Sequence, residues 1–586
     1  MQSSPISVRV ALVALFALTI ALKLCGISYS LPHAIEPDSH LAAAVGLLRS
    51  DAERTNRQND DAQYPMLVVR LAQIAPLSEP PKKLDRTLEE HLEAASRFYL
   101  LTRTVVALIA SLIVPAAFLF ARNFVPPRWA LLAAALCAGS LLHQLFAQQA
   151  RPHAAITTTM LFAVVAALRM RRTPTIAWYG VAGVAAALAI GTLQSGLAVL
   201  FSGLTAHFTR EGPRRARDHW KLAIPIAAIL ASVPLFHPFL LASSSHSEFA
   251  ALHFTSEGIQ FSKHILFWSE FNGTGWRVVL RSILFYEPLL IPLLAGALAA
   301  LALGRWRKLP LERLAAPGDR RVALAFALPY LGALVLFAST FDRFVLPLVP
   351  YLVVFAVWGA WQWSSPVHSL PVRRTALAAA AVAVTLHMAT AMRMAWLRTQ
   401  PDTLQLVASW LQQNADPAKD KVFVSPMIDL PLPRTHESLF GEGRFQPSYA
   451  RWATYQTHLR ARALPPPLWN TTFMTVRKDL GFPTARSIAD DARGYLHALG
   501  PGWYVYNANA LDKHESVERV HDALEQFGRR ELRSAPIDSG LAPDSSLFYG
   551  EEVDESTSFF TPWIFPRMWQ AHALGPVVEV WRVESP

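Results

Sequence analysis

The sequence predicts a polytopic α-helical membrane protein that ends in an α/β domain. The chain of 586 residues is 52% hydrophobic and only 17% charged, which is too apolar for a soluble protein of this size. Apolar runs recur as far as residue 396, whereas the remainder is polar and rich in Pro and turn residues. The Arg residues form short groups between the apolar runs, which is typical of the cytoplasmic loops of multi-span proteins.

About eleven membrane spans are predicted, because a helix needs about 20 apolar residues to cross the hydrocarbon core. The apolar runs are 8–29, 99–120, 129–147, 153–168, 175–190, 192–208, 222–242, 279–303, 322–340, 344–362 and 375–396. With eleven spans every basic group between the runs falls on one side, which places that side and the N-terminus in the cytoplasm. A transmembrane domain over residues 1–397 follows.

The composition argues against other classes of protein. A net charge of +11 could suggest nucleic-acid binding, but its distribution between apolar runs fits a membrane protein, and no nucleic-acid partner is expected. The two cysteines, Cys25 and Cys137, both lie in apolar runs. We therefore expect no disulfide framework and no metal site built from thiolates.

Three longer segments are expected outside the membrane, at 30–98, 243–278 and 398–586. The last has the pattern of a small α/β domain. Its predicted helices are 402–415, with Asp402 as a plausible N-cap, and 517–528. Its predicted strands are 421–426, 503–507 and 577–583.

The first external segment begins with a cluster of titratable residues. Glu36, Asp38 and His40 lie within five positions, a few residues past the first span. Asp38 has the sequence context of a helix N-cap, and it could also serve as a general base at the membrane surface. The two interpretations are compatible, because a carboxylate that accepts backbone N–H groups stays ionised at neutral pH.

Two other features of this segment bear on its role. The stretches 39–50 and 64–77 are apolar but too short to span, and the second is interrupted by Arg70, so both could lie flat in the interface. His33, Glu36, Asp38 and His40 could bind a divalent cation through oxygen and imidazole. No cofactor is predicted with certainty, and the metal ligands stay unknown.

Motifs along nearly the whole chain resemble the GT-C glycosyltransferases, in particular the bacterial enzymes related to dolichyl-phosphate-mannose-protein mannosyltransferases and to the lipid A aminoarabinose transferase. In the first external segment these are "EPDSHLAAAVGLLRSD" and "YPMLVVRLA". Further along they are "LLTRTVVALIASLIVPAAFLFAR", "QQARPHAAITTTMLF", "AIGTLQSGLAVL", "FDRFVLPLVPYLVVFA", "QPDTLQLVASWLQQN" and "GPVVEVWRV". Each motif is weak alone, and their order and spacing make the resemblance specific.

The resemblance implies a GT-C fold and a sugar transferase of the bacterial inner membrane with a periplasmic C-terminal domain. Its donor would be a polyprenyl-phosphate-linked sugar, hexosyl or pentosyl, and its acceptor a lipid, a protein or a polysaccharide. Asp38 occupies the position of the catalytic base in that family. The other candidate substrate-binding residues are Arg103, Arg343, Tyr64, Arg70, Arg151, His153, Glu36 and His40.

The chemistry of such a transfer explains why basic residues are singled out. The leaving group is a lipid phosphate anchored in the bilayer, so cations are needed at the outer interface to stabilise it. Arg103 and Arg343 lie near the outer ends of their predicted spans, and Arg151 and His153 lie at the outer entrance of the fourth. For any single one of them, snorkelling toward lipid headgroups is the ordinary alternative.

The sequence also departs from the family at three positions. Ser39 follows the expected base where Glu is usual, His153 stands in place of an acid, and Gln194 stands in place of Lys. These departures leave open a divergent subfamily with another donor or acceptor, or a member that has lost activity. The alternative functional classes are a transporter or flippase of a lipid-linked substrate and a non-catalytic membrane scaffold. Transporters usually bind at the midplane between two related halves, whereas the polar groups here gather toward the outer face.

Overall fold

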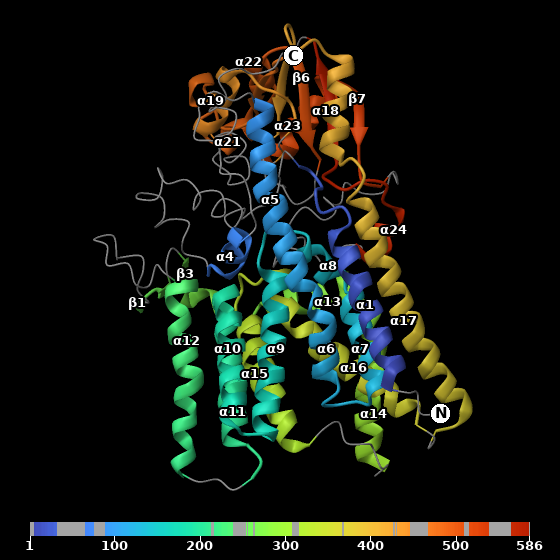
Figure 1. The fold of residues 1–586 in the computed structure, drawn as a ribbon. Helices are drawn as coiled ribbons and strands as arrows, with labels where there is room; N and C mark the ends of the chain where they lie inside the picture. The colour runs from blue at the N-terminus through green and yellow to red at the C-terminus, as the bar shows by residue number, and fades with distance from the viewer. Residues whose placement is uncertain are drawn as a thin grey trace.

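The fold is described from a computed structural model (Figure 1). The structure describes residues 5–31, 65–74, 88–212, 216–237, 253–254, 256–261, 264–307, 316–365, 368–425, 428, 430–445, 467–508, 515–537 and 564–584. It consists of a bundle of apolar helices with an α/β domain at one end, which confirms the predicted fold class.

Each of the eleven predicted apolar runs is largely helical in the bundle. The helices are α1 (Pro5–Leu24), α5 (Leu88–Ser111), α6 (Ile113–Ala121), α7 (Pro127–Gly139), α8 (Leu141–Ala147), α9 (His153–Arg172), α10 (Ile176–Thr192), η1 (Gln194–Ala198), α11 (Val199–Phe208), η2 (Ala216–Leu222), α12 (Ala223–Phe236), α13 (Trp276–Tyr286), α14 (Leu290–Arg307), α15 (Pro317–Leu336), η6 (Asp342–Leu348), α16 (Val349–Trp363) and α17 (Leu370–Leu397).

Not every run forms one long straight helix. Among the described residues six helices are long and apolar enough to cross a membrane, and up to eight if each of two bent pairs counts as one span. The pair α7–α8 bends by 54° and the pair α13–α14 by 114°. The count of eleven spans therefore stays a prediction, because several of the runs form shorter or broken helices.

Smaller elements cover the end of the bundle that faces the α/β domain. The amphipathic helix α4 (Leu67–Ile74) packs against α5, α10 and α12, and buries Leu67, Val68, Val69 and Ala72. This agrees with the prediction of a short, non-spanning segment there. An antiparallel sheet follows α12, with strands β1 (His253–Phe254), β2 (Gly258–Phe261) and β3 (His264–Phe267), and the short helix η5 (Trp268–Glu270) leads on to α13.

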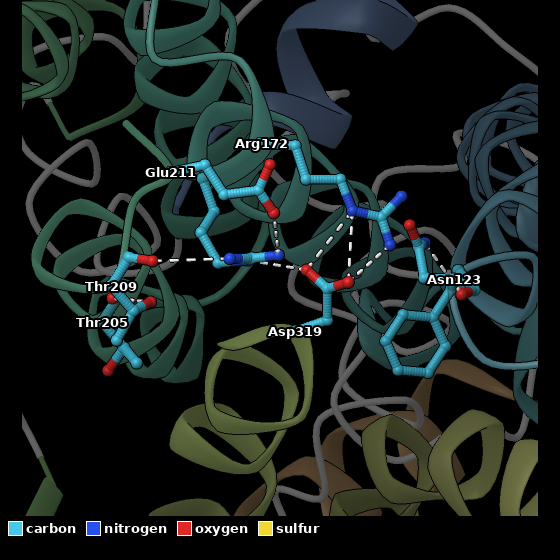
Figure 2. A network of polar contacts seen from close by, with 8 residues as sticks. Asn123, Arg172, Thr205, Thr209, Glu211 and Asp319 are labelled. Carbon is cyan, nitrogen blue, oxygen red and sulfur yellow. Dashed lines mark hydrogen bonds and ion pairs between the residues drawn. The ribbon is translucent and has the colours of Figure 1, made fainter. Parts of the chain in front are cut away.

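The opposite end of the bundle is closed by a network of ion pairs (Figure 2). Asp319, at the start of α15, is 1% exposed and accepts hydrogen bonds from Arg171 Nε at 2.7 Å and Arg172 Nη2 at 2.6 Å. Arg171 also pairs with Glu211 at 2.8 Å. The end of α9, which carries Arg171 and Arg172, therefore meets the start of α15 at this end of the bundle.

The α/β domain is built on a five-stranded sheet of order β5-β4-β6-β8-β7. Strand β4 is parallel to β5 and β6, whereas β8 is antiparallel to both β6 and β7. Its elements are α18 (Thr403–Asn414), β4 (Lys421–Val424), α19 (His436–Phe445), β5 (Asn470–Phe473), η7 (Lys478–Leu480), α21 (Ala485–Asp490), α22 (Ala492–Leu499), β6 (Gly502–Asn507), α23 (Glu515–Phe527), β7 (Arg529–Ser534), α24 (Ile564–Gln570) and β8 (Val578–Val583).

The elements predicted for this domain are all present, and others were missed. Strands β4, β6 and β8 and helices α18 and α23 match the predicted segments. Asp402 is the N-cap of α18, and its carboxylate accepts the backbone N–H of Gln405 at 2.7 Å in a capping box. Strands β5 and β7 were not predicted, because the sequence of β7, "RRELRS", has almost no apolar residues.

One segment of the C-terminal region packs into the bundle rather than onto the sheet. Met568, Ala571 and Leu574 are at most 4% exposed and belong to the hydrophobic core of the membrane helices. Helix α24 contacts α13 and α17, and Arg393 of α17 donates to the carbonyl oxygen of Ala571. The two parts of the molecule are therefore joined by side-chain packing as well as by the chain leaving α17.

Replacing Asp319 by Ala is expected to destabilise the bundle, because it leaves Arg171 buried beside only the exposed carboxylate of Glu211. Breaking a buried ion pair in this way costs about 3–5 kcal/mol. Glu211→Gln is the matched control, expected to change the free energy of unfolding by about 1 kcal/mol or less. Denaturant unfolding of the purified chain in detergent measures both, and equal effects would contradict this account of the network.

Candidate functional site

Four of the predicted site residues cannot be placed. Asp38, Glu36, His40 and Tyr64 lie outside the described residues, as does Ser39. The roles assigned to them therefore stay predictions. The other five are described: Arg70 lies on α4, Arg103 on α5, Arg151 and His153 around the start of α9, and Arg343 on η6. Figure 1 shows α4 and α8 at the end of the bundle that faces the α/β domain.

Three of these residues come together. We call Arg151, His153 and Arg343 the Arg343 cluster. His153 begins α9, and its ring lies 5.8 Å from that of Phe344, while the Arg343 guanidinium carbon lies 4.9 Å from the same phenyl ring. Both Arg343 and Arg151 act electrostatically on His153. Residues about 190 positions apart in the sequence therefore lie near one another in the fold.

The turn between α8 and α9 presents buried polar atoms to this cluster. Among the described residues, Gln149 Oε1 and His153 Nδ1 are buried and have no hydrogen-bond partner. Leaving such a group unpaired costs about 1–3 kcal/mol, so a ligand or water is expected to meet them. This turn therefore combines positive charge with an unpaired acceptor oxygen and an unpaired imidazole nitrogen, which suits a ligand that carries hydroxyl groups as well as an anion.

A second basic group surrounds Tyr29, just past the end of α1. The guanidinium carbons of Arg103 and Arg398 lie 4.1 and 4.2 Å from the centre of the Tyr29 ring, and both arginines are at most 2% exposed. We call these three residues the Tyr29 clamp. Arg103 also donates to the carbonyl oxygens of Ile27 at 2.8 Å and Tyr29 at 2.9 Å. In the structure Arg103 therefore holds the chain that leaves α1, a role beyond the phosphate contact predicted for it.

Helix α8 connects the Tyr29 clamp to the Arg343 cluster. Its C-cap residue Gln148 accepts from Arg398 at 2.9 Å and donates to the carbonyl oxygen of Cys25. Gln144 donates to the carbonyl oxygen of Leu22 at 3.0 Å. Since Arg151 and His153 follow directly after α8, the position of this short helix determines the spacing of the two basic groups.

The last described residue before the Asp38 segment, Leu31, lies next to these groups. It packs against Tyr99 and Ala150, and Ala150 precedes Arg151. Ser30 has a left-handed φ of 58°, unusual for a residue other than Gly, and donates to Asp402 of the α/β domain at 3.0 Å. Asp38 follows Leu31 by seven residues, a reach of at most about 25 Å.

Two other residues from the sequence analysis lie at separate places. Arg70 on α4 donates from Nε to the carbonyl oxygen of Leu235 at 3.3 Å, so it caps the end of α12. Gln194 begins the 3-10 helix η1 after α10. The Ser195 side chain beside it hydrogen-bonds Tyr330, whose hydroxyl donates to the Phe344 carbonyl oxygen at 3.0 Å.

The structure also reveals buried ionisable residues that the sequence analysis did not select. Lys23 of α1 is fully buried and its Nζ lies 3.0 Å from His143 Nδ1 of α8. Glu287, between α13 and α14, lies 2.9 Å from His387 of α17, and both are 1% exposed. A signal for them existed, because Lys23, Glu287 and His387 interrupt predicted apolar runs, where an ionisable residue is costly.

One group among the described residues has the spacing of a metal site, and it lies in the α/β domain. It consists of His521, Asp522 and Glu525 on α23, with possible ligand atoms within 4.8 Å of one another. His521 Nε2 is already 3.0 Å from Glu579 of β8, and Arg530 donates to the same carboxylate at 2.8 Å. The arrangement therefore serves to join α23 to the sheet, and it is remote in sequence from the predicted divalent-cation ligands.

No protein-family model and no curated protein sequence matches the chain. An oligosaccharyltransferase from Archaeoglobus fulgidus has a similar structure, with a TM-score of 0.46 and 11% identity over 86% of this chain and 70% of that one. For ArnT from Cupriavidus metallidurans the TM-score is 0.44 and the identity 13%, over 89% of this chain and 96% of that one.

A third similar structure is the arabinofuranosyltransferase AftD from Mycobacteria, with a TM-score of 0.43 and 16% identity over 100% of this chain and 40% of that one. All three are GT-C glycosyltransferases, the class that the sequence motifs resemble. With TM-scores below 0.5, the similarities do not by themselves assign an activity to this chain.

The His521–Glu579 pair predicts a pH-dependent stability of the α/β domain. The hydrogen bond to Glu579 raises the pKa of His521 above its ordinary 6.5. Burial alone would raise the pKa of Glu579, but His521 and Arg530 lower it below its ordinary 4.5. The His521 contribution is therefore complete below pH 6.5 and is lost as the pH rises through the raised pKa, while that of Glu579 is lost at acid pH.

His521→Gln is expected to lower the Tm of this domain by about 2 °C near pH 5.5, because the partly exposed pair contributes about 1 kcal/mol or less. The difference from the unmodified chain should shrink as the pH rises through the raised pKa of His521, because the imidazole then loses its charge in the folded state as well. Thermal unfolding in detergent at the two pH values measures it. A difference that is the same at both would show that packing, and not the ion pair, is responsible.

Arg398→Lys tests the Tyr29 clamp. Lysine keeps the charge but cannot reach both Gln148 and the Leu145 carbonyl oxygen, which accepts from Arg398 at 3.1 Å, and it loses the planar contact with Tyr29. We expect the free energy of unfolding to fall by about 1–3 kcal/mol. Arg373→Lys, which removes a single bond to the Ser364 carbonyl oxygen, is the control and should change it by less. Equal losses would refute the clamp.

Proposed function

We propose that the chain is a membrane glycosyltransferase that transfers a sugar from a polyprenyl-phosphate donor to an acceptor, with Asp38 as general base. The observation that carries the proposal is the Arg343 cluster, which gathers Arg151, His153 and Arg343 near Leu31, the last described residue before the Asp38 segment. A lipid phosphate is anchored in the bilayer, so its headgroup lies near the ends of the membrane helices and not at their centre.

The three parts of the reaction can be assigned to this arrangement. The acceptor hydroxyl attacks the anomeric carbon, the bond from that carbon to the phosphate oxygen breaks, and the lipid phosphate departs as an anion. Asp38 accepts the proton of the hydroxyl. Arg343 and Arg151 stabilise the additional negative charge on the departing phosphate, in a site where buried cations act more strongly than in water.

The buried atoms of the α8–α9 turn support a ligand that carries both hydroxyl groups and a phosphate. Gln149 Oε1 accepts and His153 Nδ1 either donates or accepts, so the turn can bind a sugar hydroxyl and a phosphate oxygen together. The identity of the sugar and of the acceptor is not encoded in these contacts. We assign acceptor selection to the α/β domain, because Asp402 at its start bonds Ser30 at the root of the Asp38 segment.

A second candidate function is favoured by a specific observation. Two bent helix pairs and the buried Glu287–His387 pair resemble the discontinuous helices and interior polar groups of transporters. Movement of a labelled polyprenyl phosphate across proteoliposomes without any covalent product would support transport. Formation of a glycosylated product would favour transfer.

The proposed base and phosphate site are tested with separate variants. Asp38→Asn should lower transfer by about 100-fold or more, because it removes the proton acceptor. Asp51→Asn, a change of the same type in the same external segment, is the control. The readout is mass spectrometry of lipid-linked and envelope glycans in a deletion strain complemented with each variant. Retained transfer in Asp38→Asn removes Asp38 as the base.

Arg343→Ala tests the other half of the site in the purified chain. It should weaken binding of undecaprenyl phosphate by about 10- to 100-fold, the value of a hydrogen bond to a charged group. Arg373→Ala, a change at the start of α17 that removes one bond to the Ser364 carbonyl oxygen, should leave the Kd unchanged. If the two variants bind the lipid equally well, the phosphate does not lie at the Arg343 cluster.

A further inference from the structure

Two consecutive residues at the bend between α13 and α14, Tyr286 and Glu287, bond to the starts of two other helices. Both side chains are at most 1% exposed. The bend is 114°, so α13 and α14 leave this point in very different directions. Neighbouring side chains at such a bend can therefore reach separate parts of the bundle.

The first branch runs from Tyr286 to Arg343. The Tyr286 hydroxyl donates to Asp342 Oδ2 at 2.6 Å, and Asp342 Oδ1 accepts the backbone N–H of Arg343 at 2.7 Å. Asp342 is fully buried and begins η6. Because one carboxylate oxygen bonds to Tyr286 and the other to the helix start, Tyr286 fixes the backbone that carries Arg343.

The second branch runs from Glu287 to the start of α8. Glu287 Oε1 accepts from Ser140 Oγ at 2.5 Å and from the backbone N–H of Leu142 at 3.2 Å. A carboxylate at a helix N-terminus is stabilised by the unpaired N–H groups and by the helix dipole. Helix α8 in turn ends at the turn that carries Arg151 and His153, so this branch leads to the other members of the Arg343 cluster.

His387 completes the environment of Glu287. Its Nδ1 lies 2.7 Å from the Ala383 carbonyl oxygen, which can only accept, so Nδ1 carries a proton. One further proton then lies between His387 Nε2 and Glu287 Oε2, at 2.9 Å, and the pair is neutral overall. Gly139 allows this approach, because a Cβ there would lie 2.8 Å from the backbone of His387.

We propose that Tyr286 and Glu287 are positioning residues that set the distance between Arg343 and the Arg151–His153 turn, so that both face one phosphate. The inference rests on the proposed function. Neither side chain touches the ligand in this account. Each acts through the start of a helix, Tyr286 through η6 and Glu287 through α8.

Tyr286→Phe removes only the hydroxyl group. We expect it to weaken undecaprenyl phosphate binding by about 5- to 10-fold, with a Tm similar to that of the control. The control is Tyr179→Phe, because Tyr179 is equally buried and its hydroxyl, near the start of α10, bonds to His207 near the end of α11 rather than to η6 or α8. Equal Kd values for the two variants, alongside a weaker Kd in Arg343→Ala, would overturn the inference and leave the proposed function intact.

Two substitutions of Glu287, one conservative and one not, test whether its hydrogen bonds position the turn. Gln can accept from Ser140 and Leu142 through Oε1 and donate through Nε2 to the free Nε2 of neutral His387, so Glu287→Gln should keep the Kd within about twofold. Glu287→Ala removes every one of these bonds and should weaken binding by about 10-fold. If Gln and Ala weaken binding equally, the hydrogen bonds do not position the turn.

If the unmodified chain does not bind undecaprenyl phosphate, the proposed function is rejected. Hydrogen exchange then tests separately whether Tyr286 and Glu287 hold the two helix starts in place. Tyr286→Phe should speed amide exchange in residues 341–348, and Glu287→Ala in residues 141–153, while Tyr179→Phe affects neither segment. Unchanged exchange in both segments would overturn the positioning role independently of any ligand.

Discussion

Where a helix in an apolar bundle is interrupted, its unpaired backbone N–H and C=O groups must find hydrogen-bond partners inside the protein, because hydrocarbon offers none. This constraint accounts for the buried polar residues of the structure. The break before α8 exposes backbone N–H groups, and Glu287 and Ser140 meet them. Asp342 does the same for η6. At the opposite end of the bundle, Asp319 forms ion pairs with Arg171 and Arg172. Buried ionisable residues at helix breaks and helix ends therefore act first as structural contacts, and the candidate site lies between them.

The sequence predicts the fold class well, because apolar run length and charge grouping report directly on the solvent that each segment meets. Asp402 was recognisable as an N-cap from local chemistry, which the structure confirms. The bends at Ser140 and Glu287 were not predicted, since hydropathy averages over a run and does not register a break within it. Strand β7 escaped prediction because its polar sequence becomes a strand only by pairing with β8.

The candidate site residues also fall into groups, according to what each residue contacts in the structure. Arg151, His153 and Arg343 were selected for their place at the ends of runs, and they lie together because those ends meet. Arg103 and Arg70 were selected on the same ground, but each donates to backbone carbonyls of a helix end. A position near the predicted membrane boundary therefore identifies basic residues, but it does not distinguish a residue that binds a ligand from one that caps a helix end. Arg398 could not be inferred, since its partner Tyr29 is distant in sequence.

The central claim is that a lipid phosphate lies against the Arg343 cluster at the root of the Asp38 segment. A cryo-EM structure of the chain in nanodiscs with undecaprenyl phosphate examines it most directly. The account predicts phosphate density in contact with Arg343 and with the Arg151–His153 turn, and the polyprenyl chain running from there into the bilayer. Density for the phosphate at the midplane, or at the end of the bundle where Asp319 lies, would contradict it.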